Sequence, residues 1–117
     1  MSRINLLEET INILKNHRKD ESDILWVGRR YMDYHSSNQE YITYKNTWEY
    51  FRKKANFYYD NGYGYEKVPT DLIVVGKDFW LERHSYDGSE WWEFKEIPKE
   101  PEEIRELDIF MRYGEVI

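Results

Sequence analysis

The residues best suited to chemistry are two carboxylates and an imidazole in the segment DFWLERHSYDGSEWWEFKEIP, residues 78–98. Glu82, His84 and Glu93 offer general acid and base groups, and both group types are standard ligands of divalent metals. Alternating polar residues are, however, what any solvent-facing strand shows, and this spacing matches no specific metal motif. A solvated sheet face is therefore the favoured interpretation, and a metal-dependent hydrolase that uses these three residues is the alternative.

The same segment predicts a β-hairpin. Asp87-Gly88 lies between two strand-forming runs, and this dipeptide readily adopts the positive φ angles of a tight turn. A two-residue turn pairs His84 with Trp91, whereas a three-residue loop through Ser89 would mix apolar and polar residues on both faces. The apolar pattern therefore favours the two-residue turn. The outer face then carries Trp80, Glu82, His84, Trp91, Glu93 and Lys95, and the core face carries Phe79, Leu81, Trp92 and Phe94, with Arg83 over the Trp92 ring.

The elements that position this hairpin indicate an α+β fold. Apolar residues repeat at spacings of three and four over residues 3–17, which predicts an amphipathic helix with Ser2 as its N-cap. Asn46 or Thr47 is expected to cap a second helix that ends near Asn56. The other expected elements are a strand at 24–27 closed by Gly28, a strand at 41–44 that could pair with it, an aromatic loop at 58–65, a three-stranded antiparallel meander at 71–97 and a short helix from Pro101. Both larger helices are expected to pack on one face of the sheet.

The composition indicates a single domain, residues 1–117, in a reducing cytoplasm. Cysteine is absent, which excludes disulfides and thiolate chemistry. No segment is long and apolar enough for a membrane span or a signal peptide. The chain also lacks a phosphate-binding loop, a dinucleotide fingerprint and a nucleophile elbow. We therefore expect no catalytic activity, no cofactor, no bound metal and no membrane partner.

The acidic residues are concentrated in the second part of the chain. Residues 1–70 contain 11 Lys/Arg and 10 Asp/Glu, a net charge of +1, whereas residues 71–117 contain 6 and 13, a net charge of −7. Such a surface repels nucleic acid and membranes and favours encounter with a basic protein surface, although a solvated acidic tail is the simpler explanation. The acidic residues that would meet such a partner are Glu93, Glu96, Glu100, Glu102, Glu103, Glu106 and Asp108.

Exposed aromatic residues are a second reason to expect a protein partner. Tyrosine and tryptophan dominate the binding energy of protein interfaces because they bury a large area at small entropic cost. Tyr63 and Tyr65 of the aromatic loop, with Trp80 and Trp91 of the outer hairpin face, are the candidates, and core packing is the alternative for each. A small nucleic-acid-binding regulator is a competing function for the chain. It would use Arg29, Arg30, Arg52, Lys53 and Lys54 with the tyrosines Tyr31, Tyr34, Tyr44 and Tyr50.

Residues 60–101 resemble a group of small proteins common in phages and prophages of low-GC Gram-positive bacteria. The shared elements are Tyr59-Asp60-Asn61-Gly62-Tyr63-Gly64, Val74-Val75-Gly76, Trp80-Leu81-Glu82-Arg83 and the run from Tyr86 to Lys95.

The resemblance implies a protein of phage origin that acts in the host cytoplasm, and it brings no catalytic residues with it. It implies a non-enzymatic protein that binds and inhibits a host defence protein, such as a CRISPR-associated nuclease. Inhibitors of this kind place acidic groups where the lysines and arginines of the enzyme would meet phosphate, and so mimic nucleic acid.

Overall fold

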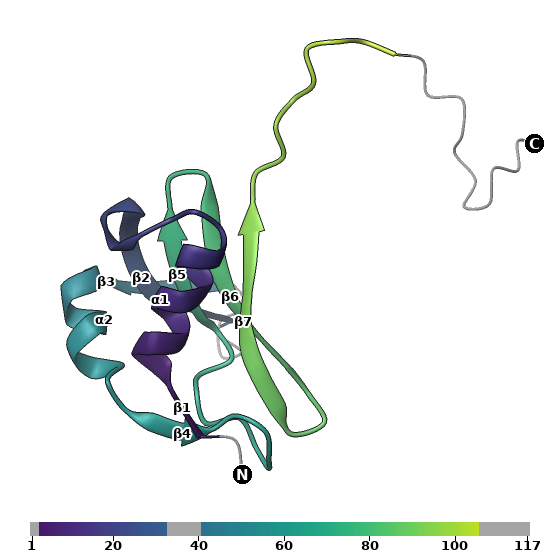
Figure 1. The fold of residues 1–117 in the computed structure, drawn as a ribbon. Coiled ribbons are helices and arrows are strands. Elements are labelled where there is room, and N and C mark those ends of the chain that lie inside the picture. The colour runs from purple at the N-terminus through teal and green to yellow at the C-terminus, as the bar shows by residue number, and fades with distance from the viewer. Residues whose placement is uncertain (1–2, 33–40, 106–117) are drawn as a thin grey trace, which may run out of the picture.

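The protein has an α+β fold in which two helices lie against one face of an antiparallel sheet (Figure 1). The computed structural model describes residues 3–32 and 41–105. The elements are β1 (Arg3–Asn5), α1 (Leu6–Asn16), a 3-10 turn (Glu21–Asp23), β2 (Ile24–Met32), β3 (Tyr41–Asn46), α2 (Trp48–Lys54), β4 (Tyr58–Asp60), β5 (Leu72–Gly76), β6 (Phe79–Tyr86) and β7 (Ser89–Glu96). No helix in this described part is long and apolar enough to cross a membrane.

The main sheet has the strand order β3-β2-β5-β6-β7, and all of its neighbouring strands are antiparallel. The predicted meander and the pairing of the two earlier strands are therefore confirmed. The prediction that Gly28 ends its strand is wrong, because β2 continues to Met32. A Cβ at Gly28 would lie 2.0 Å from the backbone oxygen of Tyr44, so glycine serves the close approach of β3.

The first helix begins later than predicted. Its N-cap is Asn5, whose side-chain oxygen accepts a hydrogen bond from the backbone N–H of Glu8 at 3.1 Å. Residues 3–5 form β1, which pairs with β4, so this backbone is extended and the helix cannot start there. Ser2, the predicted N-cap, lies outside the described residues. The second helix has the expected cap, because the hydroxyl of Thr47 accepts from the N–H of Tyr50 at 3.1 Å.

The core lies between the helices and one face of the sheet. Leu14 of α1 and Phe51 of α2 pack with Val74 and Leu81, the last two being fully enclosed. Trp92 is buried as predicted, and its indole N–H donates to the hydroxyl of Thr10 in α1 at 2.8 Å. This bond satisfies the one polar atom of a large buried ring, which fixes α1 across β7.

Two further predictions need correction. The predicted aromatic loop is partly a strand, because Tyr58–Asp60 forms β4. No helix begins at Pro101, since residues 101–105 are non-helical and extend away from the sheet (Figure 1). Ile104 is 97% exposed, so no apolar contact stabilises a short helix there, and an isolated turn is unstable in water. The rest of that predicted helix lies outside the described residues.

Candidate protein-binding face

The hairpin has the predicted register and turn. His84 faces Trp91 and Glu82 faces Glu93, while Asp87 and Gly88 have φ angles of 49° and 87°, as a two-residue turn requires. Because side chains alternate along a strand, the residues that do not face the helices share the opposite face of the sheet. We call this the outer face, and on β6 and β7 it carries Trp80, Glu82, His84, Trp91, Glu93 and Lys95.

The charged side chains of the outer face bond to one another. Nε2 of His84 lies 2.8 Å from Oε2 of Glu82 and 3.3 Å from Oε2 of Glu93. The indole N–H of Trp80 donates to Oε1 of Glu82 at 2.7 Å, and Nζ of Lys95 lies 3.4 Å from Glu93. The two carboxylates that face each other across the strands are therefore separated by a shared histidine.

Glu82 is held as a carboxylate. Burial acts to raise the pKa of Glu82, but hydrogen bonds from Trp80 and His84 outweigh it, so its pKa lies below the ordinary value. Glu82, His84 and Glu93, the residues predicted as acid, base or metal-binding groups, thus lie together, and the carboxylate oxygens point at the histidine nitrogen. In residues 3–32 and 41–105, no group of three or more His, Asp or Glu side chains is arranged to hold a metal ion.

An apolar groove of about 430 Å³ lies beside this charged cluster. Its lining residues are Trp26, Arg30, Thr43, Ile73, Val75, Trp80 and Glu82. The Trp26 ring passes over Gly28, where a Cβ would meet it at 2.9 Å. Trp26, Ile73 and Val75 were not among the predicted site residues, although the alternation of side chains in β2 and β5 places them on this face. Ile73 lines the groove but is itself buried, at 6% exposure.

The acidic excess is not on the outer face. There Glu82 and Glu93 are matched by Arg30 and Lys95, so the aromatic groove is nearly neutral. Part of the excess lies in the strand extension, residues 97–105, together with Glu96 at the end of β7: these ten residues contain four glutamates, Lys99 and Arg105, a net charge of −2. Of the predicted residues, Glu96, Glu100, Glu102 and Glu103 are exposed there, and Glu106 and Asp108 lie outside the described residues.

The two predicted tyrosines lie at a different place, the turn end of the hairpin. Tyr63 and Tyr65 are 78% and 90% exposed. Their loop packs on the hairpin turn, because a Cβ at Gly88 would lie 3.3 Å from the backbone nitrogen of Gly64. Tyr86, 78% exposed, belongs to the same end and was missed by the sequence analysis.

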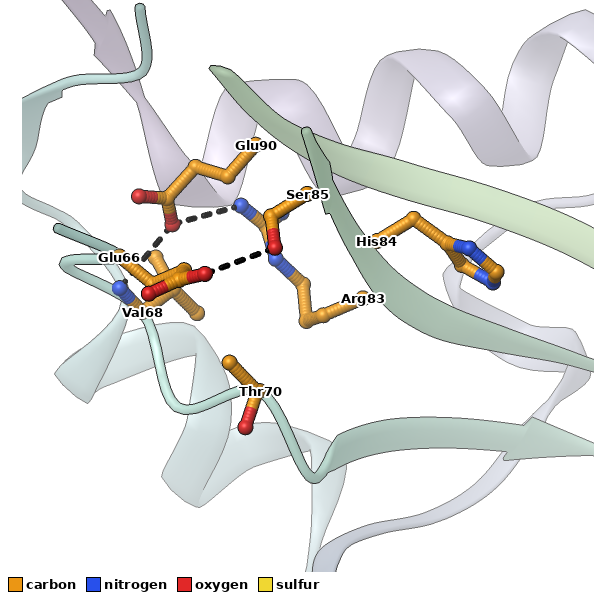
Figure 2. Close-up of a pocket in the computed structure, with 7 residues that line it drawn as sticks. All are labelled: Glu66, Val68, Thr70, Arg83, His84, Ser85 and Glu90. Atoms are coloured by element: carbon orange, nitrogen blue, oxygen red, sulfur yellow. Dashed lines mark hydrogen bonds and ion pairs between the residues drawn. The ribbon is translucent and has the colours of Figure 1, made fainter. Parts of the chain in front are cut away.

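A buried ion cluster anchors this loop to the hairpin. The side chains of Arg83 and Glu90 are only 2% and 3% exposed, and Nη2 of Arg83 lies 3.1 Å from Oε1 of Glu90. Glu90 also accepts from the backbone N–H groups of Lys67 and Val68 at 2.7 and 3.1 Å, and Figure 2 shows it between Arg83 and Val68. Arg83 lies over the Trp92 ring at 4.8 Å, as predicted, and both residues are buried.

The cluster continues to α1 and β4. Nη1 of Arg83 lies 3.3 Å from Glu9, Nη2 donates to the hydroxyl of Tyr59 at 3.0 Å, and that hydroxyl donates to Glu9 at 2.5 Å. Burial raises the pKa of Glu9, although hydrogen bonds from Tyr59 and Arg83 oppose this effect. One guanidinium thus joins the hairpin, the loop, α1 and β4, which makes it the positioning residue of this half of the molecule.

The basic residues of the competing hypothesis are divided between surfaces. Arg30 lines the outer groove, whereas Arg29 pairs with Asp71 at 2.7 Å and Arg52 pairs with Glu21 at 3.5 Å. A second groove, of about 310 Å³, lies between β3 and α2 and includes Arg29, Tyr44, Lys45 and Tyr50 in its lining. The side chain of Tyr31 and the whole of Tyr34 lie outside what the structure describes.

Comparison of the chain with protein families, with curated proteins and with solved structures finds no match.

Proposed function

We propose that this protein is a non-enzymatic binding protein that inhibits a host defence protein by covering part of its surface with the outer face. The observation that supports this best is a sheet face on which Trp26 and Trp80 border an apolar groove, on the side of the sheet away from α1 and α2. Indole and aliphatic groups in a shallow groove are what the centre of a protein interface uses.

The bonded charges next to the groove support the same proposal. Glu82, His84 and Glu93 already satisfy one another, so a partner that covers them does not leave single unpaired charges behind. Rigid, pre-formed groups also reduce the entropy lost on binding. In contrast, a general acid or base needs an atom aimed at substrate, and Nε2 of His84 is aimed at two carboxylates.

The acidic strand extension indicates that the surface of the proposed partner is positively charged. It leaves β7 next to the outer face, and its nine residues can reach up to about 30 Å if fully extended. Arg105 pairs with Glu103 at 3.2 Å, but the exposed glutamates of the extension outnumber its two basic residues. Its net negative charge suits a basic groove built for nucleic acid. Together with the resemblance to phage proteins, this makes a CRISPR-associated nuclease of the host the first target to test.

The experiment compares two lysine substitutions in a pull-down and in an assay of nuclease interference with phage or plasmid. Val75→Lys places a charge in the apolar groove, whereas Tyr58→Lys places one on the exposed surface of β4. We expect Val75→Lys to weaken target recovery and inhibition by at least about tenfold, as an unpaired charge in an interface does, and Tyr58→Lys to match wild type. Thermal unfolding checks that both variants fold.

Two results would contradict the proposal. One is full inhibition by a folded Val75→Lys protein. The other is a pull-down from host lysate that recovers no defence component although expression of the protein still protects phage.

The groove beside α2 favours nucleic acid as a second candidate ligand. There Arg29 and Lys45 lie with two exposed rings, Tyr44 and Tyr50, which is the combination of cations and stacking surfaces that binds single strands. This function predicts binding of an oligonucleotide that weakens steeply with salt and is lost in Lys45→Glu. Absence of any binding at low salt would exclude it.

A further inference from the structure

We infer that two copies of this chain associate through β7, edge to edge, to form one continuous sheet with a two-fold axis at Phe94. Within residues 3–32 and 41–105, β7 is the last strand of the sheet and pairs only with β6. An edge of this kind presents a row of backbone donors and acceptors to any strand that matches it.

The direction of the backbone groups of β7 follows from bonds at its two ends. The N–H of Ile97 donates to the carbonyl of Asp78 beside β6, whereas the N–H of Glu90 points away and donates to Asn61. In an antiparallel ladder these directions alternate by residue. The N–H and C=O groups of Trp92, Phe94 and Glu96 therefore face outward.

The strand is also regular enough to act as a template. Its eight residues pair with β6 in one unbroken register from Glu96 to Ser89, and proline follows only at Pro98. A bulge or an internal proline, the usual protections of an edge, is thus missing from β7.

Charge selects one register among those that a two-fold axis allows. An axis at residue 93 would set Glu93 against its own copy, and an axis at residue 95 would do the same with Lys95. An axis at residue 92 would require the N–H of Glu90, which is already bonded to Asn61. An axis at Phe94 instead places Glu93 opposite Lys95 of the partner subunit, and does so twice.

The same axis covers apolar surface. Phe94 is only half-buried on the core face, where His17 stacks on it at 4.0 Å and Phe79 at 5.4 Å. Pairing at residue 94 brings this ring against its own copy, next to α1 of each subunit. On the other side, the two outer faces join into one surface, with Trp91 of each copy beside the new ladder.

Cysteine cross-linking tests the register directly because the chain has no cysteine of its own. Residues 93 and 95 would form non-hydrogen-bonded pairs, with Cα atoms about 4.5 Å apart, a separation that a disulfide spans. Glu93→Cys/Lys95→Cys should oxidise to a covalent dimer, whereas neither single variant should cross-link. A dimer from Glu93→Cys alone or Lys95→Cys alone would mean a different axis and would overturn the proposal.

Charge reversal and sedimentation give a second test that does not depend on oxidation. Wild type should sediment as a dimer, Glu93→Lys should dissociate at least about tenfold more readily, and Glu93→Lys/Lys95→Glu should restore the dimer. Glu96→Pro should be a folded monomer, because its missing N–H faces away from β6. A wild type that stays monomeric at all concentrations, or a charge swap that fails to restore association, would reject the inference and leave the proposed function of the outer face intact.

Discussion

Replacing Arg83 by methionine should destabilise the protein far more than replacing any surface arginine. The Arg83 side chain is 2% exposed and faces two carboxylates, Glu90 at 3% and Glu9 at 11% exposure. Methionine keeps much of the volume but leaves those carboxylates without their cation. Glu90 keeps the two backbone N–H groups of Lys67 and Val68, which moderates the loss.

Breaking a buried pair from one side costs about 3–5 kcal/mol in the free energy of unfolding. That is a large part of the roughly 5–15 kcal/mol that holds a small domain folded. The matched control is Arg29→Met, because the Arg29 side chain is 53% exposed where it pairs with Asp71 at 19%. Solvent screens that pair, and its loss should cost less than about 1 kcal/mol.

Urea unfolding followed by tryptophan fluorescence at neutral pH measures both effects. With a slope of about 2 kcal/mol per molar urea, Arg83→Met should lower the midpoint by about 2 M and Arg29→Met by less than about 0.5 M. Arg83→Met/Glu90→Gln should recover part of the loss, since the double variant leaves one buried charge fewer. Equal midpoints for Arg83→Met and Arg29→Met would refute the view that this guanidinium anchors the hairpin.

Three smaller changes test other parts of the structure. Glu9→Gln should make the free energy of unfolding less dependent on pH in the acid range. Burial raises the pKa of Glu9 above 4.5 in the wild type, so the native state binds more protons than the unfolded state, and stability is lost as pH rises through the native pKa. The same pH dependence of stability in the variant and in the wild type, measured by urea unfolding at several pH values, would contradict this. Gly88→Ala should cost about 1–2 kcal/mol because φ is +87° there, and an unaltered melting temperature would argue against that turn. Thr47→Ala should cost about 1 kcal/mol through loss of the α2 cap, with Thr47→Ser near wild type in the same melting experiment.

The hairpin could be predicted from sequence because its determinants are local. Asp87-Gly88 defines the turn, and strict alternation then assigns each residue to a face. The cap of α2 at Thr47 was predictable for the same reason. The N-cap of α1 was not, since Asn5 is selected by the pairing of β1 with β4, and its amide donates to Asn56, 51 positions away.

The outer groove and the buried ion cluster depend on contacts between distant segments, so sequence patterns could not assemble them. Trp26 and Trp80 line one groove only because β2 and β6 both flank β5. Alternation places Arg83 on the core face, but Glu9, its partner there, is 74 positions away and no local pattern connects the two. The sequence likewise did not show where the acidic residues after Glu96 lie, because that depends on the direction in which residues 97–105 leave the sheet (Figure 1).

Alternation along β6 separates the two kinds of charge that the hairpin carries. Arg83 points inward, where its ion pairs hold the loop, α1 and β4, while Glu82 and His84 on either side point outward, where their bonds are half-exposed. Substitutions of Glu82 or His84 should therefore change what the outer face binds at little cost in stability, because exposed pairs contribute little. A substitution of Arg83 should lower stability first and binding only as a result. If a Glu82 variant lost as much free energy of unfolding as an Arg83 variant, the outer charges would be structural. That result would argue against the outer face as a recognition surface.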